Sequence, residues 1–159
     1  MIARERQRIE GSRGAIVCDT RHFPIVVLQW HGQPDAALIQ AFDRWMDDLL
    51  RALRAEQLRM ATLGDLTRAE PPSHEDRRTL VELRMKHQRE SEGHVVLDVL
   101  VSDRAALRGI CETLTWINPR APAVVATSMT EGLRRCRAAL QQVGISAPSL
   151  RAEEFEQPT

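Results

Sequence analysis

Short β-branched apolar runs alternate with helical segments along this chain, and that alternation is the feature that most limits its fold. Two apolar runs, at 15–20 and 24–30, come first and lie so close in sequence that they are expected to pair antiparallel. Each later strand is separated from the next by a helix, which is typical of parallel strands with helices on the sheet faces. The order β-β-α-β-α-β-α-β-α therefore predicts an α/β fold. We expect a five-stranded, mostly parallel sheet with one antiparallel edge strand, and four helices.

The helices are identified by their hydrophobic period and their end signals. Apolar residues recur at helical spacing over 34–54, and Pro34 suits the first helical position. A serine with an acidic residue three positions later, a capping-box pattern, begins two more helices, at Ser73 and Ser128. The helix after Ser73 has a narrow apolar stripe, so we expect it to pack lightly. Another helix is expected after Ser102-Asp103, with apolar positions at Leu107, Ile110, Cys111, Leu114 and Ile117 and an end at Asn118-Pro119.

The remaining strands differ in strength. The run at 94–101 is nearly unbroken, which suits a central strand covered on both faces. The segment 59–66 is weaker because it contains Gly64 and Asp65, and a last strand is expected at 121–127.

The chain is long enough for one domain with its own core, which we place at 14–145. A loose lead-in, 1–13, and a flexible tail, 146–159, are expected on either side. No apolar run approaches the roughly 20 residues that cross a bilayer, and the first residues lack the apolar core of a signal peptide. The three cysteines show no CxxC spacing, so we expect reduced thiols packed in the core and a cytoplasmic protein.

Charge and motifs exclude several classes of function. Lys+Arg and Asp+Glu both number 22, and this balance argues against nucleic-acid binding and against a polybasic membrane anchor. The chain has no GxGxxG, no GxxxxGK[ST] and no GxSxG, which disfavours dinucleotide, P-loop and α/β-hydrolase chemistry. The five histidines have no metal-ligand spacing. We therefore expect no cofactor, no metal and no catalytic residues.

Two carboxylates in candidate inner strands leave a choice open. Asp65 and Asp98 could form an acid/base pair beyond the carboxyl ends of the strands, or bind a cation. Alternatively, Asp65 caps a turn with Thr67, and Asp98 pairs with an arginine. We favour the second reading, which leaves an enzyme as the third hypothesis for function.

The element order, together with short motifs, resembles the STAS family (sulfate transporter and anti-sigma factor antagonist). More closely, the chain resembles uncharacterised bacterial STAS-like proteins that are grouped with CRAL-TRIO-type lipid-transfer folds. The resemblance covers about 14–145. It rests on Asp19-Thr20-Arg21-His22-Phe23-Pro24-Ile25-Val26-Val27, Leu63-Gly64-Asp65-Leu66, Trp116-Ile117-Asn118-Pro119 and Ala126-Thr127-Ser128.

In anti-sigma factor antagonists, this resemblance would imply a phosphorylatable serine within Asp-Ser-Ser-Gly or Asp-Ser-Thr-Gly. Here the stretch reads Asp65-Leu66-Thr67-Arg68, so only Asp65 carries over. The nearest hydroxyls are those of Thr67 and Ser73, neither of which matches the motif, and a role as a helix cap fully explains Ser73.

The leading hypothesis is a non-enzymatic regulatory or scaffold domain that binds a protein partner through the 66–78 loop and helix start. Arginines there can make bidentate contacts with partner carboxylates. A homodimer, formed through the edge strand or Trp116, is also possible. The alternative is a domain that binds a small apolar ligand or lipid, which requires an apolar cavity between the sheet and the helices. The predicted partner-binding residues are Asp65, Thr67, Arg68, Ser73, Arg77, Arg78 and Asp103.

Overall fold

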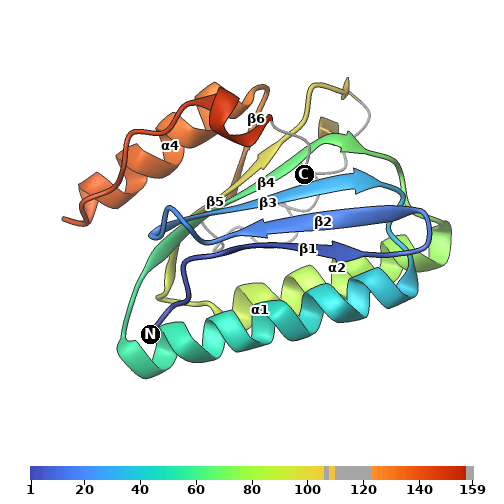
Figure 1. The fold of residues 1–159 in the computed structure, drawn as a ribbon, viewed down its shortest axis with the longest axis horizontal. Coiled ribbons are helices and arrows are strands. Elements are labelled where there is room, and N and C mark those ends of the chain that lie inside the picture. Colours follow the sequence, from blue (N-terminus) through green and yellow to red (C-terminus); the bar gives the residue numbers. More distant parts are fainter. Residues whose placement is uncertain (106–107, 110–122, 157–159) are drawn as a thin grey trace.

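The computed structural model describes residues 1–105, 108–109 and 123–156 (Figure 1). Its six strands form one sheet in chain order: β1 (Arg6–Glu10), β2 (Gly14–Asp19), β3 (Ile25–Gly32), β4 (Met60–Ala69), β5 (Val95–Val101) and β6 (Ala123–Ala126). The helices of the described part are α1 (Ala36–Glu56), α2 (His74–Glu90) and α4 (Met129–Gln142), with a short 3₁₀ turn, η1 (Ala152–Phe155).

The sheet is mixed. β1, β2 and β3 pair antiparallel, and β3, β4, β5 and β6 pair parallel. The antiparallel pairing predicted for 15–20 and 24–30 is confirmed, as is the α/β fold with helices between parallel strands. Within the described residues, no helix is long and apolar enough to cross a bilayer.

The predicted number of strands was wrong, because β1 lies in the segment expected to be a loose lead-in. Only Ile9 in β1 is apolar, and the strand is partly or fully exposed along its length, so it shows no alternation to detect. Backbone pairing with β2 creates this strand, with Arg6 opposite Asp19. β1 is therefore the antiparallel edge strand, and the strand expected at the edge is second in the sheet.

The predicted number of helices also differs from what the structure describes, which is three α-helices rather than four. The helix expected after Ser102-Asp103 falls mainly on 106–107 and 110–122, outside the described residues, together with Cys111 and Trp116. The tail expected to be flexible contains η1, and Phe155 within it is buried against the sheet.

Helix ends follow their capping chemistry. Asp35 caps α1 by accepting a hydrogen bond from the Leu38 N–H at 2.8 Å, so Pro34 lies before the helix rather than at its first position. The predicted caps Ser73 and Ser128 are confirmed, since each side chain accepts a backbone N–H of its own helix.

The two faces of the sheet are covered unequally. Figure 1 shows α1 and α2 on one face, with α4 and η1 on the other. α1 buries seven apolar side chains against its face of the sheet, whereas α2 buries none completely. Residues 95–98 of β5 are only half-buried, so the coverage predicted for this strand holds for Val99–Val101 alone. The light packing predicted for α2 is confirmed.

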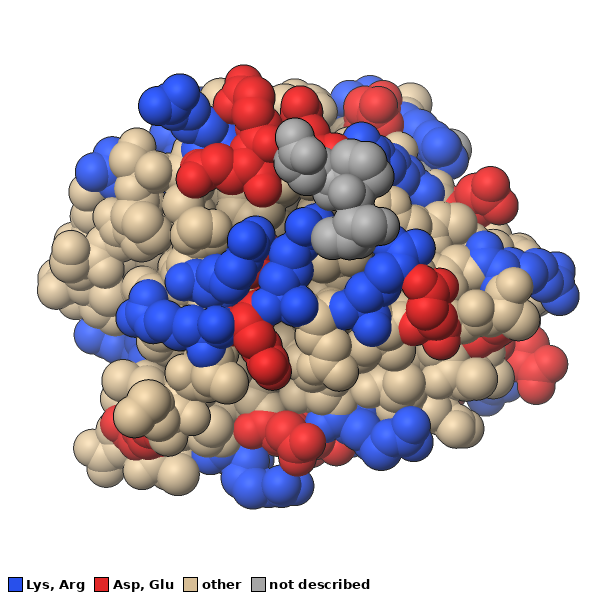
Figure 2. All heavy atoms as spheres, viewed as in Figure 1, with Lys and Arg blue, Asp and Glu red and all other residues tan. Residues whose placement is uncertain are grey.

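Charges on the surface are mixed. Figure 2 shows basic side chains across the middle of one face, with acidic side chains among and around them.

Candidate functional site

A cavity of about 640 Å³ lies between the sheet and the two helices α1 and α2. Strands β3, β4 and β5 contribute its floor, and the loop that precedes α2 lines one end. The sheet and α1 line it mainly with apolar side chains, among them Leu28, Trp30, Phe42, Met46, Leu50 and Leu100. The cavity that the apolar-ligand hypothesis requires is therefore present.

Small side chains on β4 and a polar α2 explain why this space is not filled. Thr62 and Gly64 of β4 face the cavity where a central strand would ordinarily carry larger apolar residues. The side chains of α2 that face the sheet include only a few apolar ones, of which Leu80, Val81 and Leu83 are half-buried. Close packing against β4 and β5 would need more apolar volume than α2 carries.

Asp98 lines the cavity and is paired with an arginine of α2. The Arg84 Nη2 lies 2.7 Å from the Asp98 Oδ2, and the Thr62 hydroxyl donates a hydrogen bond of 2.8 Å to the Asp98 Oδ1. The prediction that Asp98 pairs with an arginine is confirmed. This pair neutralises the one carboxylate that β5 places on the cavity floor.

Asp65 lies on the opposite face of the sheet. Thr62 and Asp65 are three residues apart in β4, so their side chains point to opposite faces. The Asp65 Oδ1 accepts hydrogen bonds from the backbone N–H and the hydroxyl of Thr67, at 3.0 and 2.7 Å. The amide of Gln29 links Asp65 to the carbonyl of Phe155, beneath η1. The predicted contact between Asp65 and Thr67 is present, but it lies within β4 rather than at a turn. The catalytic pair of Asp65 and Asp98 does not form.

The predicted partner-binding residues divide between a surface and the interior. Arg68, Ser73, Arg78 and Asp103 are exposed, and we call these four residues the α2-start surface. They gather at the end of the sheet where β4 stops, since Arg104, next to Asp103, donates a hydrogen bond to the Ala69 carbonyl at 2.9 Å.

The other three predicted residues lie elsewhere. Asp65 is buried, Thr67 is half-buried, and Arg77 lines the cavity. Thr67 and Arg68 belong to β4 rather than to a loop, because β4 stays paired with β3 as far as Gly32 and Ala69.

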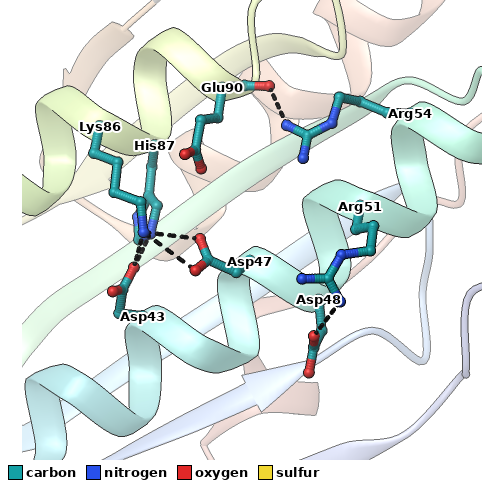
Figure 3. A network of polar contacts seen from close by, with 8 residues as sticks. All are labelled: Asp43, Asp47, Asp48, Arg51, Arg54, Lys86, His87 and Glu90. Carbon is teal, nitrogen blue, oxygen red and sulfur yellow. Dashed lines mark hydrogen bonds and ion pairs between the residues drawn. The ribbon is translucent and has the colours of Figure 1, made fainter.

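A polar cluster joins α1 to α2, and the sequence analysis did not anticipate it. Figure 3 shows the Lys86 ammonium between two carboxylates of α1, at 3.0 Å from Asp43 and 3.1 Å from Asp47. The His87 Nε2 lies 2.9 Å from the same Asp43 oxygen. Lys86 is the only lysine of the chain, and that was the one available signal.

The ligand atoms of Asp43, Asp47 and His87 are close enough to hold a metal ion. In the structure the Lys86 ammonium supplies the positive charge instead, so the cluster functions as an ion pair between helices. Burial raises the pKa of Asp43, but hydrogen bonds from Lys86 and His87 outweigh it and hold that pKa below its usual value. Burial lowers the pKa of His87 by more than Asp43 raises it, which favours the neutral imidazole.

The two described cysteines are packed in the core, as predicted. Cys18 and Cys136 are buried, one on each side of the sheet. Burial raises the pKa of both thiols, that of Cys136 to about 12, so neither is a thiolate at neutral pH.

No protein-family model and no curated protein matches this chain. A solved structure of an uncharacterized protein from Shewanella loihica PV-4, of the DUF3478 family with a SpoIIAA-like fold, matches with a TM-score of 0.54. The two share 11% sequence identity over 83% of this chain and 92% of that one. The fold is STAS-like.

An anti-sigma factor antagonist from Mycobacterium paratuberculosis matches with a TM-score of 0.49 and 15% identity, over 84% of this chain and 93% of that one. The STAS-like fold predicted from the sequence is confirmed by the match to the Shewanella loihica PV-4 structure.

Proposed function

We propose that this chain is a non-enzymatic binding domain that holds a small apolar ligand or lipid in the cavity beneath α2. The observation that carries the proposal is the cavity itself, about 640 Å³ with a mainly apolar floor. Ligand pockets have volumes of about 300–1,000 Å³ and similar linings. Protein interiors leave few voids larger than a water molecule, so a partly open cavity of this size offers unusual room for a ligand.

The contacts made by the two inner carboxylates support a binding role over a catalytic one. Asp65 is engaged by Thr67 and Gln29 on one face of the sheet, and Asp98 by Arg84 and Thr62 on the other. A general acid and base must act on the same substrate, and these two side chains cannot reach a common one.

The test uses N-phenyl-1-naphthylamine, a neutral dye whose fluorescence rises in apolar surroundings. We expect saturable binding with one site per chain. Val81→Phe, which places a ring in the cavity, should abolish binding, and Thr79→Phe, which places the same ring on the exposed face of α2, should preserve it. Equal binding by the two variants would show that the dye lies elsewhere, and an absence of binding by the wild type would contradict the proposal.

A second candidate function is the binding of a protein partner through the α2-start surface. The observation that favours it is the gathering of exposed arginines and hydroxyl and carboxylate groups where β4 ends and α2 begins. Arg68 and Arg78 are exposed and can bind carboxylates of a partner, although Arg78 also contacts Glu82 of its own helix at 3.4 Å. A cytoplasmic location, a homodimer and the absence of nucleic-acid binding stay predictions.

Cross-linking in the native cells tests this second function. A specific cross-linked species should disappear in the double variant Arg68→Glu and Arg78→Glu and persist in Arg44→Glu, a control on the exposed side of α1. A species that survives the double variant, or is lost equally in the control, would contradict binding at this surface. Light scattering of the purified chain separates a homodimer from a foreign partner.

A further inference from the structure

The charges that line the cavity are distributed unevenly along α2. Arg77 and Arg84 are two helical turns apart, so they lie on the same face of the helix, toward the sheet. Arg84 is neutralised by Asp98 at 2.7 Å. Asp98 is further held by Thr62, so the middle of the cavity carries a compensated pair.

Arg77 has no such compensation in the described part of the chain. Its Nε is buried without a hydrogen-bond partner there, and no carboxylate lies within ion-pair distance of it. Glu70 also lines the cavity, but its side chain is exposed and forms no ion pair with Arg77. Buried donors in folded proteins nearly always have an acceptor, and one that the described residues do not supply to Arg77 is consistent with a bound ligand.

One further titratable group of α2 that lines the cavity is already engaged. His87 lines the cavity, and its Nε2 contacts Asp43 of α1. Burial holds the pKa of His87 below its usual value, so the ring is not a competing cation at neutral pH. The cations of α2 that remain for a ligand are Arg77, near its start, and Arg89, near its end. Arg89 is exposed, whereas the Arg77 Nε is buried, so Arg77 is the cation that faces the interior of the cavity.

The lining beyond Arg77 suits a single hydrocarbon chain. Apolar side chains of β3, α1 and β5 follow one another along α2, which rises about 15 Å between Arg77 and His87. The volume of about 640 Å³ corresponds to roughly twenty groups of water size, at about 30 Å³ each. One chain of medium to long length with its head group fits this volume, and a lipid with two long chains exceeds it.

From this arrangement we infer that the cavity ligand is a single-chain amphiphile with an anionic head group, and that the Arg77 guanidinium binds the head. The inference rests on the proposed cavity function and adds the chemical class and the orientation of the ligand. The carboxylate or other anion accepts hydrogen bonds from Arg77, and the chain extends over Leu28 and Leu100 toward Met46 and Leu50. Arg77 is thus a ligand-binding residue rather than part of the α2-start surface.

A comparison of matched ligands tests the head group. Tetradecanoate and tetradecanol have chains of the same length and differ in charge, and the displacement of N-phenyl-1-naphthylamine by each is measured below its solubility limit in water. We expect the wild type to bind the acid at least about tenfold more tightly, the effect of one charge-assisted hydrogen bond. Arg77→Gln should remove this preference and leave the affinity for the alcohol unchanged. Arg78→Gln, the exposed neighbour, should keep the preference.

The outcomes separate this inference from the function on which it rests. Equal affinity of the wild type for acid and alcohol would overturn the anionic head group while the cavity function stands, and this result needs no variant. A preference that survives in Arg77→Gln would overturn the assignment to Arg77. If neither ligand displaces the dye, or the dye does not bind, the cavity function itself fails. Thermal unfolding of each variant verifies that it is folded.

Discussion

Val81→Phe is the substitution that most sharply separates an empty cavity from a filled core. Val81 lies on the face of α2 that lines the cavity and is only half-buried. In a close-packed interior, a larger side chain there would collide with the sheet and destabilise the protein by about 1–3 kcal/mol. Over a cavity of about 640 Å³, the ring instead gains contacts with the apolar floor.

The expected gain follows from the added surface. Phenylalanine adds four carbon atoms to the valine side chain, and burial of each methylene-sized group stabilises by about 0.8 kcal/mol, which sets an upper limit of about 3 kcal/mol. Valine and phenylalanine have similar helix propensities, so α2 itself is little affected. Because the cavity is partly open, we expect a gain of about 1–2 kcal/mol. For a chain of 159 residues this raises the unfolding midpoint by roughly 2–8 °C.

Urea and thermal unfolding of the ligand-free protein measure this gain. Thr79→Phe is the matched control, because Thr79 is a β-branched residue on the exposed side of the same helix and no cavity awaits its ring. The wild type and this control should have the same unfolding midpoint, and the midpoint of Val81→Phe should be higher than both. A loss of stability in Val81→Phe comparable to that of an overpacked core would refute the cavity.

Three further predictions test other parts of the structure. Burial holds the pKa of His87 below 6.5, so the unfolded chain takes up a proton first as the pH falls. The free energy of unfolding, measured by urea titration, should therefore decrease from pH 7.5 to 5.5. In His87→Gln the free energy should change less steeply with pH, and an unchanged pH dependence would contradict the buried neutral ring. Lys86→Met should cost about 1 kcal/mol and raise the pKa of Asp43, followed by NMR, because two carboxylates then lose their shared cation. Gly132→Ala should destabilise by about 1 kcal/mol, since a Cβ would lie 2.8 Å from Leu63 and overpacking exceeds the gain in helix propensity. A more stable Gly132→Ala variant would contradict the close approach of α4 to β4 and β5 at this position.

The sequence predicted those parts of the fold that a strong local pattern specifies. α1 was predicted by its apolar period, and α2 and α4 by serine caps that the structure confirms. β1 could not be found, because an exposed edge strand is held by backbone pairing and needs no apolar alternation. The end of β4 was misplaced for a similar reason, since Arg68 and Ala69 extend it by pairing with β3.

The candidate site could be predicted only in part. The sequence indicated that Asp98 would pair with an arginine, but among so many arginines it could not identify Arg84. The narrow apolar stripe of α2 indicated light packing, whereas the cavity depends on how far α2 stands from β4 and β5, a tertiary property. Arg77 and Arg78 were equivalent in the sequence, and only the rotation of α2 places one in the cavity and the other on the surface.

The most direct test of the central claim is NMR of methyl-labelled protein with tetradecanoate. We expect nuclear Overhauser contacts between the ligand chain and methyl groups on both walls of the cavity, Val81 of α2 and Leu100 of β5. Leu133 and Leu140 of α4, on the opposite face of the sheet, should show none. Contacts confined to surface methyl groups, or equal on both faces, would contradict a ligand held beneath α2.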